Sequence, residues 1–489
     1  MIKKNEIFKT EITDMSDEGA GIGRTEDGFI WFIKNTVIGD EVEALAMKVK
    51  KNYGFARLVS ITEPSKDRVD PPCPIAGRCG GCQLQAMSYE AQLSFKERKV
   101  INNLRRIGGF EEMPDPEKIL GAEEGEVLRY RNKAQYPVGR DKKGDIAAGF
   151  YAGGTHSIIN CRDCLLGAAE NRDILEYVID WMKKYDISPY DETTGKGLLR
   201  HLLIRKGFRT GEIMVCPVIN GRRLPHEREF VEGLLGLKLP ENSRITSISY
   251  SSNMENTNVI MGKEAVNIYG KPYIEDVIRR HYFGEEQRGE KEGTQEGEKA
   301  DEIRFRISAL SFYQVNPYQM EKLYSKALEY AELTGNETVW DLYCGTGTIS
   351  LFLARRAKKV YGVEIIPQAI ENARENGKIN GIENAEFFVG KAEEVLPAWY
   401  EKNRDEAGAH PDVIVVDPPR KGCDERCLET IVKMAPKRVV YVSCDSATLA
   451  RDLRYLCDRG YELKKIMACD MFPMTVHCEC VVKLERKDQ

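Results

Sequence analysis

Hydrophobic and polar positions follow two different patterns, one at the start of the chain and one over its last third. Residues 1–63 contain short apolar stretches such as GFIWFI (28–33) and GFARLVSI (54–61), separated by turns that contain glycine. Short strands joined by tight turns predict a small antiparallel β-barrel. From residue 303 onward, strand-like apolar runs alternate with amphipathic segments, which predicts a doubly wound α/β domain.

The stretch VVYVSCDSATLARDL (439–453) passes from one kind of element to the other at Cys444. Its first four residues form the apolar, β-branched run of a buried strand. Residues 446–456 carry leucines on one helical face, which predicts a helix with Ser446 as its N-cap. Cys444 therefore stands at a strand-to-helix turn, either as a small core side chain or as a functional thiol.

The composition of the stretch between these two regions indicates where the segments of the chain begin and end. Residues 285–302 (EEQRGEKEGTQEGEKADE) have eight acids, three bases and no large apolar side chain, which predicts an acidic disordered linker. We therefore expect four segments. They are a barrel over 1–63, a central mixed α/β domain over 64–284, the linker over 285–302, and a C-terminal α/β domain over 303–489.

Charge and cysteine content narrow the class of protein. The linker contributes −5 to a formal charge of −5, so the rest of the chain is neutral overall. Basic clusters at 96–106, 129–143 and 200–209, the last two with interleaved aromatics, favour a nucleic-acid-binding surface. No run of 18 apolar residues and no signal-peptide core occur, which predicts a cytoplasmic protein without a membrane partner. Fourteen cysteines in such a protein indicate metal ligation or catalysis rather than disulfides.

Three of these cysteines lie within ten residues. Cys73, Cys79 and Cys82 follow the spacing C-x5-C-x2-C in the glycine-containing loop CPIAGRCGGCQLQ, which favours a metal cage over a core. Cys161 and Cys164 both offer the fourth thiolate. Spacing alone does not separate a zinc site from an iron–sulfur cluster.

A second motif predicts a nucleotide-ligand site. In TVWDLYCGTGTISLFLA (338–354) an apolar strand runs into the turn at Gly345 and Gly347, and an apolar helix follows. These glycines permit close approach of the backbone to a ligand. The next strand ends at Glu364, placed to accept from ribose hydroxyls. The turn lacks the full G-x-G-x-x-G of dinucleotide sites, which favours S-adenosylmethionine over NAD.

Two further side chains with chemical potential stand at predicted strand ends. The strand VIVV (413–416) delivers Asp417 to the carboxyl edge of the sheet, beside the edge expected for Cys444. Arg420 stands where enzymes that methylate exocyclic amines carry an aromatic after D-P-P, so that chemistry is disfavoured. A helix N-terminus near Cys444 would favour its thiolate. Glu479, just before the last strand, is a candidate general base or an exposed strand acid.

These motifs together resemble the bacterial 23S rRNA (uracil-5-)-methyltransferases that carry a TRAM domain and a 4Fe-4S cluster. FYQVN (312–316), DLYCGTG, VDPPRKG, YVSCDSATLARDL and DMFPMTVHCE match the family in order, and CPIAGRCGGCQLQ and the early GIG match its accessory regions. The resemblance covers nearly the whole chain and is weakest between residues 173 and 304.

The resemblance implies a fold and a set of roles. The fold would be a TRAM barrel of OB-like form, a central iron–sulfur domain and a Rossmann-like S-adenosylmethionine-dependent methyltransferase domain, the first two binding RNA. Cys444 would be the nucleophile and Glu479 the general base. The methyl-donor site or its border with the target base would be lined by Gln314, Tyr343, Glu364 and Asp417. The 4Fe-4S cluster would be held by Cys73, Cys79, Cys82 and Cys164, the last preferred to Cys161.

The expected reaction is methyl transfer from S-adenosylmethionine to carbon 5 of a specific uridine, with no protein partner evident. A TRAM barrel with a cluster resembles the 23S rRNA branch more than the tRNA enzymes, which remain the alternative substrate class. A cytosine-5 methyltransferase would carry its cysteine after a proline in a different loop. A non-catalytic iron–sulfur RNA-binding protein would have no reason to keep Cys444 and Glu479 together.

Overall fold

The N-terminal strands form a closed five-stranded barrel. The computed structural model describes residues 2–283, 302–405 and 410–487, and the predicted acidic linker therefore lies almost wholly outside the described residues. The barrel order is β1-β2-β3-β5-β4, and its interior holds Trp31 and Ile33. The predicted barrel is confirmed, except that β3 and β5 pair in parallel. The strands are β1 (Ile7–Met15), β2 (Gly21–Arg24), β3 (Ile30–Ile33), β4 (Glu41–Val49) and β5 (Tyr53–Glu63).

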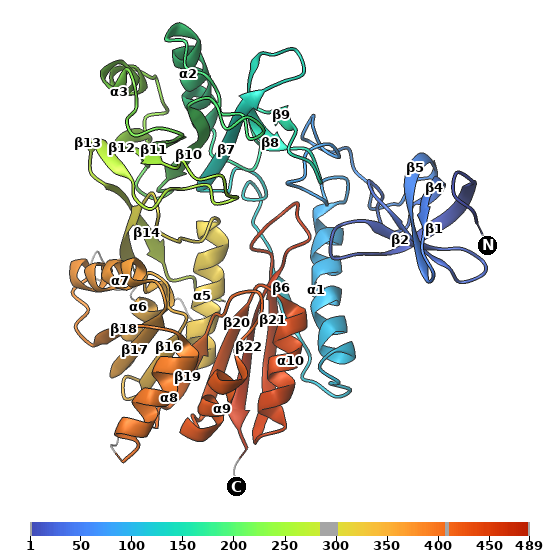
Figure 1. The fold of residues 1–489 in the computed structure, drawn as a ribbon. Helices are drawn as coiled ribbons and strands as arrows, with labels where there is room; N and C mark the ends of the chain where they lie inside the picture. The colour runs from blue at the N-terminus through green and yellow to red at the C-terminus, as the bar shows by residue number, and fades with distance from the viewer. Residues whose placement is uncertain (1, 284–301, 406–409, 488–489) are drawn as a thin grey trace.

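A seven-stranded mixed sheet, in the order β13-β12-β11-β10-β7-β8-β9, makes up most of the central region (Figure 1). Its apolar face packs against α2 and α3 around Phe230 and Trp181. The elements are β7 (Lys133–Arg140), β8 (Ile146–Tyr151), β9 (Ile158–Asn160), α2 (Asn171–Lys184), β10 (Leu199–Lys206), β11 (Glu212–Ile219), α3 (Glu227–Leu235), β12 (Arg244–Ser252) and β13 (Val266–Gly270).

The C-terminal region is built on an eight-stranded sheet in the order β18-β17-β16-β19-β20-β22-β21-β6. Its first five strands are parallel and β22 runs against them, so the predicted doubly wound domain is confirmed. The strands are β16 (Thr338–Leu342), β17 (Lys359–Glu364), β18 (Ala385–Val389), β19 (Val413–Val416), β20 (Arg438–Ser443), β21 (Tyr461–Cys469) and β22 (Glu479–Arg486).

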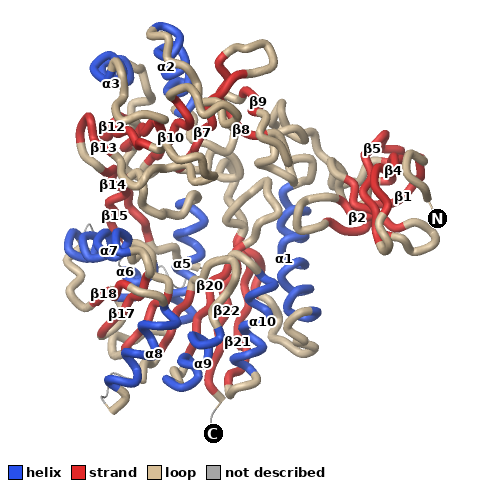
Figure 2. Tube along the Cα trace, in the orientation of Figure 1, coloured by secondary structure: helices blue, strands red, loops and turns tan. Residues whose placement is uncertain are grey.

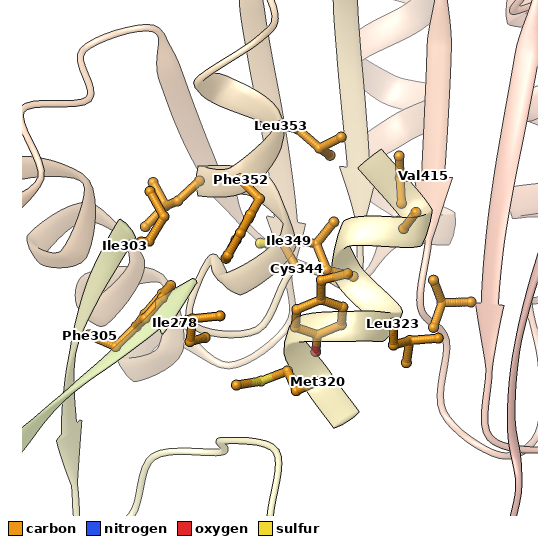
Figure 3. Packing of buried hydrophobic residues seen from close by; sticks show 14 of the residues in the cluster. Ile278, Ile303, Phe305, Met320, Leu323, Cys344, Ile349, Phe352, Leu353 and Val415 are labelled. Atoms are coloured by element: carbon orange, nitrogen blue, oxygen red, sulfur yellow. The ribbon is translucent and has the colours of Figure 1, made fainter. Parts of the chain in front are cut away.

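Helices cover both faces of this sheet (Figure 2). Figure 3 shows part of the larger core, in which Met320 of α5 and Phe352 of α6 lie close to Ile278 of β14 (Tyr273–Arg279) and Phe305 of β15 (Glu302–Ser308). The helices are α5 (Pro317–Ala331), α6 (Thr348–Ala354), α7 (Pro367–Ile379), α8 (Ala392–Asn403), α9 (Glu425–Met434) and α10 (Ser446–Cys457).

The expected boundary at residue 303 does not separate independent bodies. The helix α1 (Tyr89–Arg106) packs against α10, and β6 (Glu117–Leu120) extends the C-terminal sheet beside β21, although both precede the central sheet in the chain. A two-stranded ribbon of β14 (Tyr273–Arg279) and β15 (Glu302–Ser308) crosses the same boundary. The basic sequence of α1 gave no sign of this docking.

The structure corrects one sequence expectation at a single residue. The N-cap of α10 is Asp445 rather than Ser446, because the Asp445 carboxylate accepts from the Ala447 and Thr448 N–H groups at 2.9 and 3.1 Å. Across the described residues, no helix combines the length and apolarity that crossing a bilayer requires.

Candidate active site

One cavity of about 690 Å³ opens at the carboxyl ends of the parallel strands. This is the edge where open α/β sheets bind their ligands. The cavity contains all six side chains that the sequence predicted for catalysis and methyl-donor binding. They are Gln314, Tyr343, Glu364, Asp417, Cys444 and Glu479.

The glycine turn after β16 forms one end of this cavity. Gly345 and Gly347 have φ of 56° and 80°, and a Cβ on Gly347 would lie 3.1 Å from Ala373. The Gly345 N–H donates to Glu364 Oε2 at 3.2 Å, and the other carboxylate oxygen accepts from Ile366 N–H at 3.0 Å. Glu364 therefore fixes the turn and still faces the cavity, so its remaining lone pairs are available to a ligand.

Cys444 and Glu479 are brought together by the register of two antiparallel strands. Ser443 of β20 pairs with Cys480 of β22, so Cys444, directly after β20, lies beside Glu479, the first residue of β22. Cys444 is half-buried, whereas Glu479 is only 4% exposed. A thiol and a carboxyl group thus face one cavity from neighbouring strand ends, which is the placement that nucleophile and proton-transfer group require.

Electrostatics at this rim oppose ionisation. Burial, then the charges of Glu479 and Asp417, raise the pKa of the Cys444 thiol to about 11. Burial raises the pKa of Asp417 to about 7 and, with Asp417 nearby, lifts the pKa of Glu479 well above its usual value. These effects outweigh any lowering of the Cys444 pKa by the α10 N-terminus, where Asp445 already accepts from the Ala447 and Thr448 N–H groups.

Replacing Asp417 by asparagine should make Cys444 more reactive. The change removes a negative neighbour, so the pKa of Cys444 falls and the thiolate fraction rises at any pH below that pKa. Alkylation by iodoacetamide at pH 8 should accelerate about tenfold for each unit of pKa change. Mass spectrometry of the Cys444 peptide measures the rate, with Asp412→Asn as a distant control. An unchanged rate would show that Asp417 does not act on the thiol.

The loop between β21 and β22, residues 470–478, is held by α1. Lys96 of α1 forms a fully buried ion pair with Asp470 and donates to the Phe472 carbonyl oxygen at 3.0 Å. The Tyr89 hydroxyl donates to the second Asp470 oxygen at 2.9 Å. Because the loop carries Phe472 into the cavity and leads directly to Glu479, α1 sets the position of one wall of the site.

Sequence reasoning missed three residues at or beside the cavity, Arg131, Asn132 and Phe472. Arg131, from the segment before β7, lines the cavity, and Asn132 donates to the Gln314 carbonyl oxygen at 2.9 Å. Phe472 lines the cavity as well. The motif RYRNKAQY placed both Arg131 and Asn132 in a basic cluster, but nothing in it indicated contact with the FYQVN loop.

A second cavity of about 610 Å³ adjoins the first and contains the predicted cysteines. Cys73, Cys79, Cys82 and Cys164 line it together with Cys161, and its border with the first cavity is shared by Arg131, Arg420 and His477. Among the residues that the structure describes, no group of three or more Cys, His, Asp or Glu side chains is arranged as a site for a metal ion. The thiols share a cavity without forming such a site.

The cysteine loop also contacts the loop that leads to Glu479. Gln83 and Leu84, directly after Cys82, donate their N–H groups to the Met474 carbonyl oxygen at 3.1 and 3.0 Å. Burial raises the pKa of Cys82 and of Cys161 to about 12 in both cases. The cavity has Arg131, Lys133 and Arg420 in its lining and no carboxylate among its described residues, so its charge suits an anionic occupant.

Comparison with known proteins agrees with this arrangement. Residues 295–487 match the family model described as tRNA (Uracil-5-)-methyltransferase, and residues 3–59 match the TRAM domain. An uncharacterized RNA methyltransferase of Bacillus cereus is 46% identical over 488 residues, covering 100% of this chain and 98% of that protein. Another from Clostridium tetani is 44% identical over 482 residues, covering 98% and 96%.

A solved structure shares the fold over almost the full length. The Pyrococcus abyssi tRNA (uracil-54, C5)-methyltransferase, in complex with S-adenosyl-L-homocysteine, has a TM-score of 0.73 and 27% identity, covering 98% of this chain and 100% of that one. The chain therefore belongs to the S-adenosylmethionine-dependent RNA (uracil-5-)-methyltransferases that carry a TRAM domain.

Proposed function

We propose that this enzyme methylates carbon 5 of a uridine in 23S rRNA through a covalent adduct between Cys444 and carbon 6 of the base. The observation that carries the proposal is the placement of Cys444 and Glu479 side by side, at the ends of adjacent strands that face one cavity. A thiol and a buried carboxyl group at that position match the two tasks that carbon-5 methylation of uracil imposes.

The first task is to make carbon 5 nucleophilic. Addition of the Cys444 sulfur to carbon 6 forms a C–S bond and moves the ring electrons toward carbon 5 and oxygen 4. Because the pKa of Cys444 is about 11, the thiol must lose its proton as the base binds, and Asp417, with a pKa of about 7, is the neighbouring group able to take it at neutral pH. Carbon 5 then attacks the sulfonium methyl group in line, so that a C–C bond forms while the S–CH3 bond of the donor breaks and S-adenosylhomocysteine is released.

The second task is to remove the proton that remains on carbon 5. Glu479 as carboxylate accepts it, and the electron pair of the broken C–H bond restores the ring double bond while expelling the Cys444 thiolate. The raised pKa of Glu479 makes it a stronger base than an exposed glutamate. The target base must leave its stack to reach the cavity, where Phe472 offers an aromatic surface.

The methyl donor would occupy the end of the cavity built by the glycine turn. Glu364 there would accept from ribose hydroxyls, as acids at this strand end do for nucleotides. Tyr343, which has φ of 68°, and Gln314 would line the space between donor and target base together with Asp417.

The choice of RNA is tested by mapping 5-methyluridine. Cells that lack this protein should lose one or more 5-methyluridines from 23S rRNA, while those in tRNA remain, and purified enzyme with S-adenosylmethionine should restore them. Loss confined to tRNA would instead favour the activity named for the Pyrococcus abyssi relative. Site-resolved mass spectrometry of both RNA classes separates the outcomes.

We also propose that the cysteine cavity holds a 4Fe-4S cluster on Cys73, Cys79, Cys82 and Cys164. Five thiols around one space, with cations and no carboxylate among the described lining residues, suit an anionic thiolate-bound cluster. Methyl transfer moves no net electrons, so the cluster would organise the Cys82–Leu84 segment that contacts Met474 rather than take part in the reaction.

Anaerobically purified protein should contain iron and sulfide and absorb in the visible, and Cys164→Ser should lose both. The same variant should bind RNA more weakly while its affinity for S-adenosylmethionine is kept, because the Cys82–Leu84 segment contacts Met474 in the loop that leads to Glu479, where the target base would bind. Cys161→Ser is the matched control and should keep the cluster. If Cys161→Ser loses the cluster and Cys164→Ser keeps it, the assignment of the fourth ligand is reversed.

A further inference from the structure

Tyr324 of α5 lines the active-site cavity but has no part in the mechanism proposed above. It is 4% exposed and shares the cavity with Cys444 and Glu479. We propose that Tyr324 is a positioning residue that fixes the orientation of the Gln314 amide, and that the site thereby selects uracil over cytosine. This inference rests on the proposed function, which places Gln314 beside the target base.

The helix α5 brings Tyr324 to the reacting edge of the sheet. This helix packs against β20 and β22, the strands whose ends carry Cys444 and Glu479. Asn316 caps the helix two residues after Gln314. Because helical side chains lean toward the N-terminus of their helix, the Tyr324 ring leans back toward the segment that contains Gln314.

The Tyr324 hydroxyl is hydrogen-bonded to the side chain of Gln314. Burial and then the charge of Asp417 raise the pKa of Tyr324 well above its usual value, and Glu479 adds to this effect. The hydroxyl therefore keeps its proton at any pH at which the enzyme works. The two carboxyl groups are nearby acceptors for that proton, which leaves the hydroxyl oxygen to accept from the Gln314 amide N–H.

The main chain at Gln314 is held independently of Tyr324. Asn132 Nδ2 donates to the Gln314 carbonyl oxygen at 2.9 Å, and the Asn132 N–H donates to the Val315 carbonyl oxygen at 2.8 Å. The remaining freedom of Gln314 lies in its side chain, whose terminal torsion can exchange the amide oxygen and nitrogen. The hydrogen bond to Tyr324 selects one of these two orientations.

The selected orientation suits uracil. With its nitrogen bonded to Tyr324, the Gln314 amide presents its oxygen to the base. Uracil carries a hydrogen on N3 that can donate to this oxygen, whereas N3 of cytosine has no hydrogen and is itself an acceptor. Cytosine would therefore place two acceptors face to face, which a buried hydrogen-bonding site rejects. An amide released from Tyr324 could turn over and accommodate cytosine as well.

Equilibrium binding of two matched RNAs tests this role. The probes are a fragment that contains the mapped target uridine and the same fragment with cytidine at that position. Binding is measured in full-length Cys444→Ala protein, so that no covalent adduct contributes. That protein should prefer the uridine RNA by about tenfold or more, and adding Tyr324→Phe should bring the two affinities within about twofold of each other. Tyr330→Phe, which changes another buried tyrosine of α5 outside the described cavity lining, is the matched control and should keep the preference.

A preference for uridine that survives Tyr324→Phe would overturn the proposal, because a purely structural role changes both affinities without changing their ratio. Equal binding of the two RNAs by the Cys444→Ala protein would overturn it as well. Gln314→Ala in the same background should also lose the preference. If Gln314→Ala keeps it, the placement of Gln314 beside the base fails together with this inference. If Gln314→Ala loses it and Tyr324→Phe does not, only the role of Tyr324 fails.

Discussion

Cys444→Ala should lower methylation of RNA by at least about a thousandfold. Without the sulfur, carbon 5 of uracil stays a poor nucleophile, and no other described side chain in the cavity is a thiol placed beside Glu479. The measurement is transfer of a labelled methyl group from S-adenosylmethionine to RNA under single-turnover conditions, which reports the chemical step and not product release.

The matched control for this change is Cys457→Ala, at the far end of α10 from the site. That protein should methylate at the normal rate. Cys444→Ala should keep its affinity for S-adenosylmethionine, because the thiol lies at the rim toward the target base. A normal rate in Cys444→Ala would refute the covalent mechanism, and a lost affinity for the methyl donor would assign Cys444 to binding.

Glu479→Gln should trap the enzyme on its RNA. The amide cannot accept the carbon-5 proton, so addition and methyl transfer proceed but elimination of Cys444 does not. We expect turnover to fall by about a hundredfold or more, within the usual contribution of a general base. A protein–RNA species that survives denaturing electrophoresis and contains the transferred methyl group should accumulate.

Two further variants test whether Glu479 is the group that accepts the carbon-5 proton. The double variant Cys444→Ala with Glu479→Gln should form no stable species, because the trapped bond is to the Cys444 sulfur. Glu485→Gln, on the same strand β22 but at its opposite end, should turn over normally. Turnover without accumulation in Glu479→Gln would mean that another group removes the proton.

Local sequence patterns singled out Asp417, Cys444 and Glu364 because each stands at the end of a strand, whereas Gln314 and Tyr343 were implied only by the family resemblance. Asp417 and Cys444 follow apolar runs, and the edge of a parallel sheet gathers whatever follows its strands. Glu364 was found in the same way. No local sequence pattern indicated that Lys96 is buried, because its burial depends on an ion pair with Asp470, which is 374 positions away in the chain.

The sequence was less informative about the pKa of Cys444 and about the boundaries between domains. Burial of Cys444 and the charges of Glu479 and Asp417 raise its pKa, and together they outweigh the expected influence of the helix terminus. The docking of α1 and β6 onto the C-terminal sheet is likewise a long-range event. Hydrophobic periodicity reports which face of an element is buried, but not against which partner.

The anchoring of loop 470–478 by α1 bears on how this enzyme can be dissected. A fragment that begins at residue 303 would lose β6 and expose the edge of β21, a template for aggregation. It would also leave Asp470 without Lys96, and removal of one partner from a buried ion pair costs about 3–5 kcal/mol. Truncation therefore removes part of the catalytic body along with the barrel, so inactivity of such a fragment would say nothing about which segment recognises RNA.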